Sequence, residues 1–155
     1  MVNKNAIFFD RDGVLIIPKV IKNKSYAPRK FSDFKLYPET KKCIPSLRKA
    51  GYKIIVITNQ PDIANNLITV SELNKMHLKL NNEILIDQIY TCMHNKFENC
   101  ECRKPKAGML IKAIKDYNIN VNKSYLIGDR YSDIEAAKKI KCKSIFIDRN
   151  YDEIR

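Results

Sequence analysis

The sequence predicts an α/β domain with a five-stranded, mostly parallel sheet flanked by helices. Short apolar segments alternate with segments of helical period along the whole chain, as in parallel sheets whose strands are connected by helices. Some of the apolar segments are continuous, which is typical of strands that are covered on both faces. The chain has 155 residues, which is enough for a sizeable core, so we expect residues 1–155 to form a single domain.

The first half of the chain contains two predicted strands and a predicted helix. Residues 6–10 form a short apolar run that ends in polar loop residues, which predicts a strand. Residues 14–34 contain two prolines and show no clean period, so we expect a long substrate loop there. Residues 39–50 place apolar side chains at helical spacing, and Gly51 follows as a C-terminal cap. Residues 52–58 are rich in β-branched side chains and predict the second strand.

The second half of the chain continues this alternation. Ser71 is the expected N-cap of a second helix, which contains His77 as a surface or packing residue, and Ile111 is expected to face the core from a third helix. Cys43 and Cys142 have the size and polarity of small core residues. The other predicted strands are residues 87–91, 124–127 and 144–147, and the other predicted helices are residues 107–117 and 133–140.

Acidic residues directly follow two of the predicted strands. Asp10 and Asp12 are two positions apart at a strand end, so their side chains are expected to face one spot, and Asp129 follows residues 124–127. Because ligands of parallel sheets bind beyond the carboxyl ends of the strands, we expect the three carboxylates to form one pocket. Such a pocket suits Mg²⁺, and a carboxylate beside that ion can attack phosphorus. The alternative, that these acids only cap a turn and a helix, explains their recurrence at equivalent strand ends less well.

Two further side chains could bind a phosphoryl group at this edge of the sheet. Thr58 ends the second strand and offers a hydroxyl group and a backbone N–H. Lys104 lies between Arg103 and Pro105, and its ammonium group could offset charge on a transferring phosphoryl group. Either residue alone would be ordinary, as a β-branched strand end or as one lysine among many, and their positions in the chain are what favour the functional interpretation.

A loop over residues 92–105 carries a predicted zinc site. Its four candidate ligands, Cys92, His94, Cys100 and Cys102, lie within eleven residues. Three thiolates and an imidazole suit tetrahedral zinc, and four protein ligands leave no open position, so the ion is expected to be structural. A redox or free-thiol role is the alternative, and a disulfide is disfavoured in a reducing compartment.

The composition indicates a soluble globular protein with a basic surface. The formal net charge is +12, but the lysines are scattered, which favours small phosphorylated substrates over a nucleic-acid site. No apolar run approaches the roughly 20 residues that span a bilayer, so we expect no membrane partner. The N-terminus runs straight into the first strand and leaves no room for a signal peptide, which predicts a cytoplasmic protein. We expect it to be a monomer.

Four segments of the chain resemble the motifs of the haloacid dehalogenase (HAD) superfamily of phosphatases. They are Asp10-Arg11-Asp12-Gly13, Thr58-Asn59-Gln60, Lys104, and Gly128-Asp129-Arg130 with Asp133. The zinc loop running into Cys102-Arg103-Lys104-Pro105 is similar to that of the small, zinc-containing branch without a cap domain. The resemblance covers nearly the whole chain and implies one Rossmann-like domain with no large cap.

The resemblance also implies roles for the catalytic residues. Asp10 would be the nucleophile that forms an aspartyl-phosphate, and Asp12 the general acid and base. Catalytic Mg²⁺ would be held by the side chains of Asp10 and Asp129 and by the backbone carbonyl of Asp12. Thr58 and Lys104 would hold the transferring phosphoryl group.

The substrate contacts implied by the resemblance come from loops around these acids. Arg103 would recognise the far end of the substrate. The further substrate-binding residues would be Asn23, Lys24, Ser25, Tyr26, Asn59, Gln60 and Arg130.

The branch includes D-glycero-D-manno-heptose-1,7-bisphosphate 7-phosphatases and histidinol-phosphate phosphatases. The segment of residues 106–110 resembles the heptose enzymes, whereas the short gap between His94 and Cys100 resembles the histidinol-phosphate type. Removal of the 7-phosphate from the heptose bisphosphate is therefore the favoured expectation, and histidinol phosphate is the alternative substrate. A polynucleotide end-phosphatase and a non-catalytic binding module remain as further alternatives.

Overall fold

The computed structural model describes residues 2–152, and its centre is a five-stranded parallel sheet in the order β5-β4-β1-β6-β7. The strands are β1 (Ala6–Phe9), β4 (Lys53–Asn59), β5 (Gln88–Cys92), β6 (Tyr125–Gly128) and β7 (Lys143–Phe146). Every neighbouring pair in this sheet is parallel, so all five carboxyl ends lie at the same edge. The predicted fold class is confirmed.

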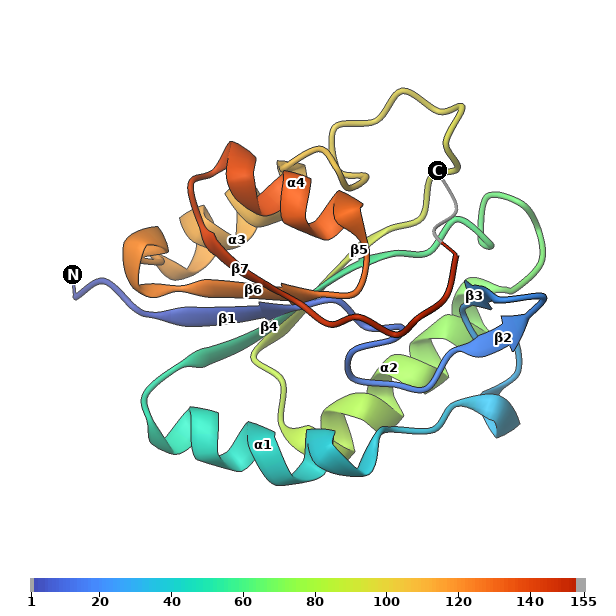
Figure 1. Cartoon of the computed structure of the whole chain (residues 1–155), viewed down its shortest axis with the longest axis horizontal. Coiled ribbons are helices and arrows are strands. Elements are labelled where there is room, and N and C mark those ends of the chain that lie inside the picture. The colour runs from blue at the N-terminus through green and yellow to red at the C-terminus, as the bar shows by residue number, and fades with distance from the viewer. Residues whose placement is uncertain (1, 153–155) are drawn as a thin grey trace.

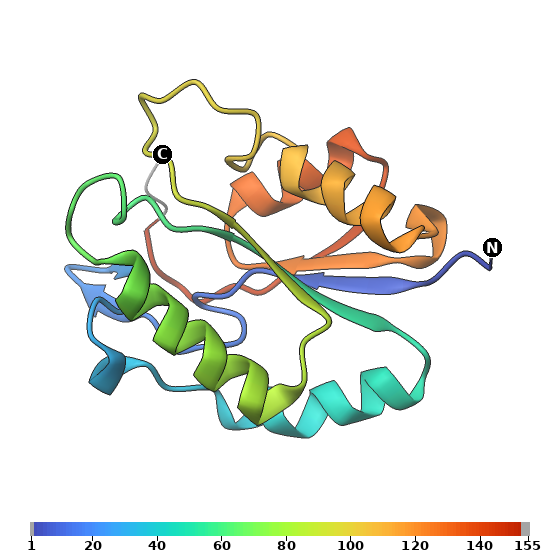
Figure 2. The same ribbon diagram turned by 180° about the vertical axis from the view of Figure 1, so that it is seen from behind.

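Helices cover both faces of the sheet (Figures 1 and 2). The helices of the described residues are α1 (Pro38–Lys49), α2 (Val70–Ile84), α3 (Gly108–Tyr117) and α4 (Tyr131–Lys139). The central strand β1 shows why: Ile7 and Phe9 join the core cluster that includes apolar residues of α1 and α2. Ala6 and Phe8 point the other way and join the cluster that includes residues of α3 and α4. Burial on both faces explains the continuous apolar character of this strand.

The predicted long loop is partly core. Val14, Leu15 and Ile16 are buried, because Gly13 N–H donates to Ile16 O and the turn brings these apolar residues back under the sheet. Phe34 is also fully buried. The middle of the segment projects as a hairpin of β2 (Lys19–Ile21) and β3 (Lys24–Tyr26), followed by the 3₁₀ helix η1 (Phe31–Asp33).

Four local predictions are wrong or displaced. Helix α2 begins two residues earlier than expected, because the Thr69 hydroxyl is the N-cap in place of Ser71 and accepts from Glu72 N–H at 3.2 Å. Ile111 is 58% exposed, since Met109, Leu110 and Ala113 form the inward face of α3. Cys43 is exposed on α1. The helix expected over residues 133–140 begins at Tyr131. Gly51 follows α1 with φ +88°, as expected of a cap, and Cys142 is buried.

No helix within residues 2–152 is both long and apolar enough to cross a membrane.

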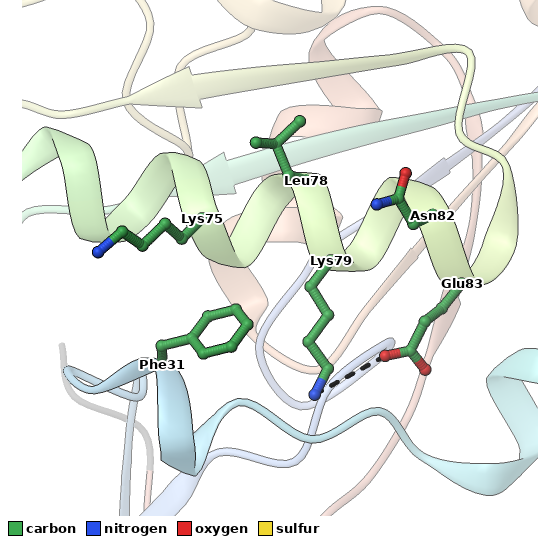
Figure 3. Close-up of a pocket in the computed structure, with 6 residues that line it drawn as sticks. All are labelled: Phe31, Lys75, Leu78, Lys79, Asn82 and Glu83. Atoms are coloured by element: carbon green, nitrogen blue, oxygen red, sulfur yellow. Dashed lines mark ion pairs between the residues drawn. The ribbon is translucent and has the colours of Figure 1, made fainter.

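A shallow hollow of about 420 Å³ lies between η1 and α2. Figure 3 shows Phe31 of η1 pointing toward α2 across this hollow, with Lys79 paired to Glu83 at 3.8 Å. None of the acids that follow the strands lines it.

Candidate active site

Three buried carboxylates meet at the carboxyl edge of the sheet. Asp10 follows β1, and its N–H donates to Ile127 O of the neighbouring strand at 2.9 Å. Asp129 follows β6, and Asp133 lies in the first turn of α4. One oxygen of each of the three carboxylates lies within 4.8 Å of the others. Asp133 therefore takes part in the pocket, although sequence reasoning did not assign it a role.

One buried ammonium group faces this pocket. Lys104 Nζ lies 3.0 Å from Asp10 Oδ1 and 2.6 Å from Asp133 Oδ1, and it donates to Ile57 O at 2.8 Å. The Asn59 amide holds the backbone of Lys104 in place: its Nδ2 donates to Lys104 O, and its Oδ1 accepts from Lys104 N, both at 3.1 Å. Asn59 was predicted to bind substrate, but its amide nitrogen and its amide oxygen both bind the backbone of Lys104 and so position that residue.

The pocket holds more negative than positive charge. Burial and then repulsion from Asp10 raise the pKa of Asp129 to about 8, and the same two causes raise the pKa of Asp133 to about 6, against the attraction of Lys104. Burial lowers the pKa of Lys104, but attraction to Asp10 and Asp133 outweighs it and the pKa is raised. Asp129 Oδ1 is buried and accepts no hydrogen bond from any described residue. Carboxylate oxygens with excess negative charge and a free acceptor fit a divalent cation such as Mg²⁺.

The Asp12 carboxylate has partners different from those of Asp10. Arg11 donates to it from Nε and Nη2 at 3.1 and 3.0 Å, and Gln60 Nε2 donates at 2.7 Å. Gln60 is 1% exposed and also donates to the Thr58 hydroxyl at 2.8 Å. It was predicted to bind substrate, but its amide instead orients Asp12 and Thr58. The expectation that Asp10 and Asp12 face one spot assumed a strand through both, whereas β1 ends at Phe9.

Arg11 itself is fully buried and links Asp12 to the core. Its Nη1 donates to His77 Nε2 at 3.1 Å, and its guanidinium carbon lies 5.5 Å from the centre of the Phe34 ring. Burial and then the positive charge of Arg11 lower the pKa of His77 to about 3, so the imidazole is neutral and accepts this bond. His77 is thus a packing residue whose partner is Arg11. The position of His77 along α2 did not reveal this partner.

The four predicted zinc ligands lie together. His94 Nδ1 lies 3.2 Å from Cys102 Sγ and 3.5 Å from Cys92 Sγ, and Cys92 Sγ lies 3.7 Å from Cys100 Sγ. All four ligand atoms fall within 4.8 Å of one another, an arrangement that fits a tetrahedral metal ion. The chain passes directly from this cluster to Arg103, whose Nη1 donates to His94 O at 3.4 Å, and then to Lys104.

Only part of the predicted substrate loop reaches the acids. Ser25 is buried, and Arg130 Nη2 donates to its hydroxyl oxygen at 2.8 Å and to its carbonyl oxygen at 3.1 Å. Because Arg130 follows Asp129, this contact brings the hairpin to the pocket. Asn23 and Lys24 are exposed at the hairpin tip, and Tyr26 is half-buried.

The sequence pattern of the polynucleotide kinase 3 phosphatase family matches residues 5–151. The chain belongs to this family. A relative from Helicobacter pylori, D-glycero-beta-D-manno-heptose-1,7-bisphosphate 7-phosphatase, is 32% identical over 150 residues, which cover 93% of this chain and 83% of the relative. The D-glycero-alpha-D-manno-heptose-1,7-bisphosphate 7-phosphatase of Campylobacter jejuni is 38% identical over 136 residues, covering 84% and 74%.

A solved structure supports the same grouping. The D,D-heptose 1,7-bisphosphate phosphatase from B. bronchiseptica, in complex with magnesium and phosphate, is similar with a TM-score of 0.78 and 25% identity, covering 90% of this chain and 78% of that one. The resemblance to HAD phosphatases is therefore confirmed, and the chain is a phosphatase.

Proposed function

We propose that this phosphatase removes the 7-phosphate of D-glycero-D-manno-heptose 1,7-bisphosphate, with Asp10 as nucleophile and Mg²⁺ as cofactor. The observation that carries the reaction type is the pocket of Asp10, Asp129 and Asp133 around one lysine. The substrate comes from the relatives from Helicobacter pylori and Campylobacter jejuni, which are named for it and match most of this chain.

The first step is attack of an Asp10 carboxylate oxygen on phosphorus. Asp10 Oδ1 accepts from Lys104 Nζ at 3.0 Å and from Arg11 N–H at 2.8 Å, which fixes the carboxylate for that attack. The bond from phosphorus to the ester oxygen breaks, and the leaving oxygen takes a proton from Asp12. The products are the dephosphorylated sugar and an aspartyl-phosphate on Asp10.

The second step is hydrolysis of the aspartyl-phosphate. Asp12 takes a proton from water, the water oxygen bonds to phosphorus, and the Asp10–phosphorus bond breaks to release inorganic phosphate. Lys104 and the Thr58 hydroxyl would hold the phosphoryl oxygens through both steps. Magnesium held by Asp10, Asp129 and the Asp12 carbonyl oxygen would supply the positive charge that offsets repulsion between carboxylate and phosphate.

Substitution of Asp10 by Asn tests this mechanism. The variant lacks the nucleophile, so kcat is expected to fall at least about 100-fold, with an unchanged circular dichroism spectrum. Asp33→Asn, an exposed change in η1, is the matched control and should retain the activity of the natural chain. Residual activity of Asp10→Asn above a few per cent would rule out an aspartyl-phosphate on Asp10.

The substrate requires a separate test. We expect kcat/KM to be highest for one anomer of the heptose bisphosphate, whose second phosphate would meet Arg103 and Arg130. Histidinol phosphate and a 3′-phosphorylated oligonucleotide are the competitors. A higher kcat/KM for histidinol phosphate would change the proposed substrate and leave the proposed mechanism unchanged. Preference for the oligonucleotide, with KM rising steeply with salt, would indicate a nucleic-acid end-phosphatase, which the net charge of +12 would suit.

The loop of Cys92, His94, Cys100 and Cys102 would hold a structural Zn²⁺ that fixes the position of Lys104. Metal analysis of the purified protein is expected to find about one zinc per chain, and an active zinc-free protein would overturn this assignment. Clustered thiols without disulfides suit a reducing compartment, so we propose a cytoplasmic enzyme. We also propose that it acts as a monomer on a small phosphorylated substrate.

A further inference from the structure

The segment that follows β7 crosses the carboxyl edge of the sheet. Ile147 N–H donates to Gly128 O at 2.8 Å, which continues the pairing beyond β7. Two residues later, Arg149 Nε donates to Gly13 O at 2.8 Å, and its guanidinium carbon lies 4.2 Å from the centre of the Tyr37 ring. In Figure 1 this segment, in dark red, runs from β7 toward the β2–β3 hairpin.

The end of this segment is fastened to the hairpin tip. Asp152 N–H donates to Asn23 O at 2.7 Å, and Asn23 Nδ2 donates to Asp152 Oδ1 at 3.1 Å. The segment is therefore held on both sides of Tyr151, by Arg149 before it and by Asp152 after it. This arrangement fixes where the Tyr151 side chain lies.

Tyr151 points into the acid pocket. Its hydroxyl donates to Asp129 Oδ2, and the ring is half-buried. Gly13 makes the approach possible: a Cβ at this position would collide with the Asp129 carboxylate and with the Tyr151 hydroxyl, and its φ of +88° also favours glycine. The other oxygen, Asp129 Oδ1, is buried and accepts no hydrogen bond from any part of the chain that the structure describes.

We propose that Tyr151 is a positioning residue of the cation site, which holds Asp129 by its Oδ2 so that Oδ1 faces the metal. The inference rests on the proposed function, because it assumes that Asp129 binds a divalent cation. Groups that hydrogen-bond to the ligands of a metal typically change its affinity by about 10- to 100-fold. Tyr151 is thus expected to set cation affinity and not the chemical step, which belongs to Asp10, Asp12 and Lys104.

Tyr151→Phe isolates the hydroxyl group, because the ring that packs at the edge of the pocket stays. We expect the dissociation constant of Mn²⁺, measured by electron paramagnetic resonance on zinc-loaded protein without substrate, to rise about tenfold or more. The Mg²⁺ concentration that gives half-maximal activity should rise by the same factor. At saturating Mg²⁺, kcat should stay within about threefold of the natural chain, since the reacting groups are unchanged.

Two further variants make the outcome decisive. Tyr52→Phe also removes a phenol hydroxyl, from a ring that packs edge-on against Tyr125 with centroids 6.4 Å apart, and it should bind Mn²⁺ like the natural chain. Asp129→Asn should lose Mn²⁺ binding, so that the signal of the free ion stays at full intensity, and it thereby identifies the site. Equal Mn²⁺ affinity in Tyr151→Phe and the natural chain would overturn the inference while leaving the proposed function intact. Equal affinity in Asp129→Asn and the natural chain would overturn both.

Discussion

Two groups of charged side chains at opposite ends of the same sheet are built in opposite ways. At the amino end, Asp87 precedes β5 and accepts from Arg48 Nη1, Lys53 Nζ and Ile54 N–H, each at 2.8 Å. At the carboxyl end, Asp10, Asp129 and Asp133 share one lysine, and Asp129 Oδ1 has no donor among the described residues. Asp87 thus has its cations within the chain, and we call this group the complete cluster. The three acids at the carboxyl end outnumber their one lysine, and we call that group the deficient cluster.

The pKa values of the acids express this difference. Burial alone would raise the pKa of Asp87, but the three donors outweigh it and the pKa is lowered. Burial and repulsion raise the pKa of Asp129 to about 8. The ionised form of an aspartate is therefore stabilised at Asp87 and destabilised at Asp129. A buried site that disfavours its own charges is suited to bind a cation, and this requirement separates a functional site from a structural ion pair.

The largest expected effect comes from removing the buried ammonium group of Lys104. Lys104→Met leaves three acids without a counter-charge, so without divalent cation the free energy of unfolding is expected to fall by about 3–5 kcal/mol. Turnover should fall at least about 100-fold, because no ammonium faces the phosphoryl group. Urea denaturation and kcat measure the two effects. Lys106→Met is the control, since Lys106 forms a surface pair with Glu101 at 2.9 Å; an equal loss in both variants would contradict the comparison.

Adding Mg²⁺ should stabilise the deficient cluster alone. At a concentration 100-fold above its dissociation constant, the ion is expected to raise the free energy of unfolding by about 2.7 kcal/mol. Thermal unfolding with and without Mg²⁺ gives the shift. Asp129→Asn should abolish this response, and Asp87→Asn should keep it. A response that survives in Asp129→Asn would place the ion elsewhere.

The smallest expected effect is at the complete cluster. Asp87→Asn removes a carboxylate that is held by two cations, and at pH 7 we expect a loss of about 2 kcal/mol with unchanged kcat. Because the folded pKa lies below its ordinary value of 3.8, this contribution is present above pH 3.8 and disappears as the pH falls through the folded value. Urea denaturation at pH 7 and at a series of pH values below 3.8 tests this, with the exposed change Glu135→Gln as control. A difference that does not shrink as the pH falls below 3.8 would exclude the ionised carboxylate as its source.

Most of the pocket follows from the order of residues along the chain. Asp10 and Asp129 directly follow apolar strands, and the carboxyl ends of parallel strands share one edge, so their meeting was predictable. Asp133 was harder to assign, because an acid in the first turn of a helix is also an ordinary cap; here it fills both roles, since its Oδ2 accepts from Arg130 N–H at 3.1 Å.

Tyr151 could not be predicted, because nothing in its neighbours along the chain marks it. It reaches Asp129 only because Arg149 and Asp152 bind Gly13 and the hairpin, which are more than 100 residues away in sequence. The same holds for Gln60 and Asn59, which were expected to bind substrate. Whether a buried amide faces a ligand or a neighbour depends on which acceptors the fold brings within hydrogen-bonding distance.

The sequence by itself determined the parallel sheet, the edge at which the acids meet, the nucleophile candidate and the cysteine cluster. Periodicity and short-range spacing carry this information, since strand alternation and ligand spacing are local properties of the chain. The tertiary structure decided how charge is distributed between the acids, which oxygen of Asp129 is left free, and that Gln60 joins Arg11 in binding the Asp12 carboxylate. These depend on burial and on contacts between distant segments, and the energy of a charge is set by everything that surrounds it.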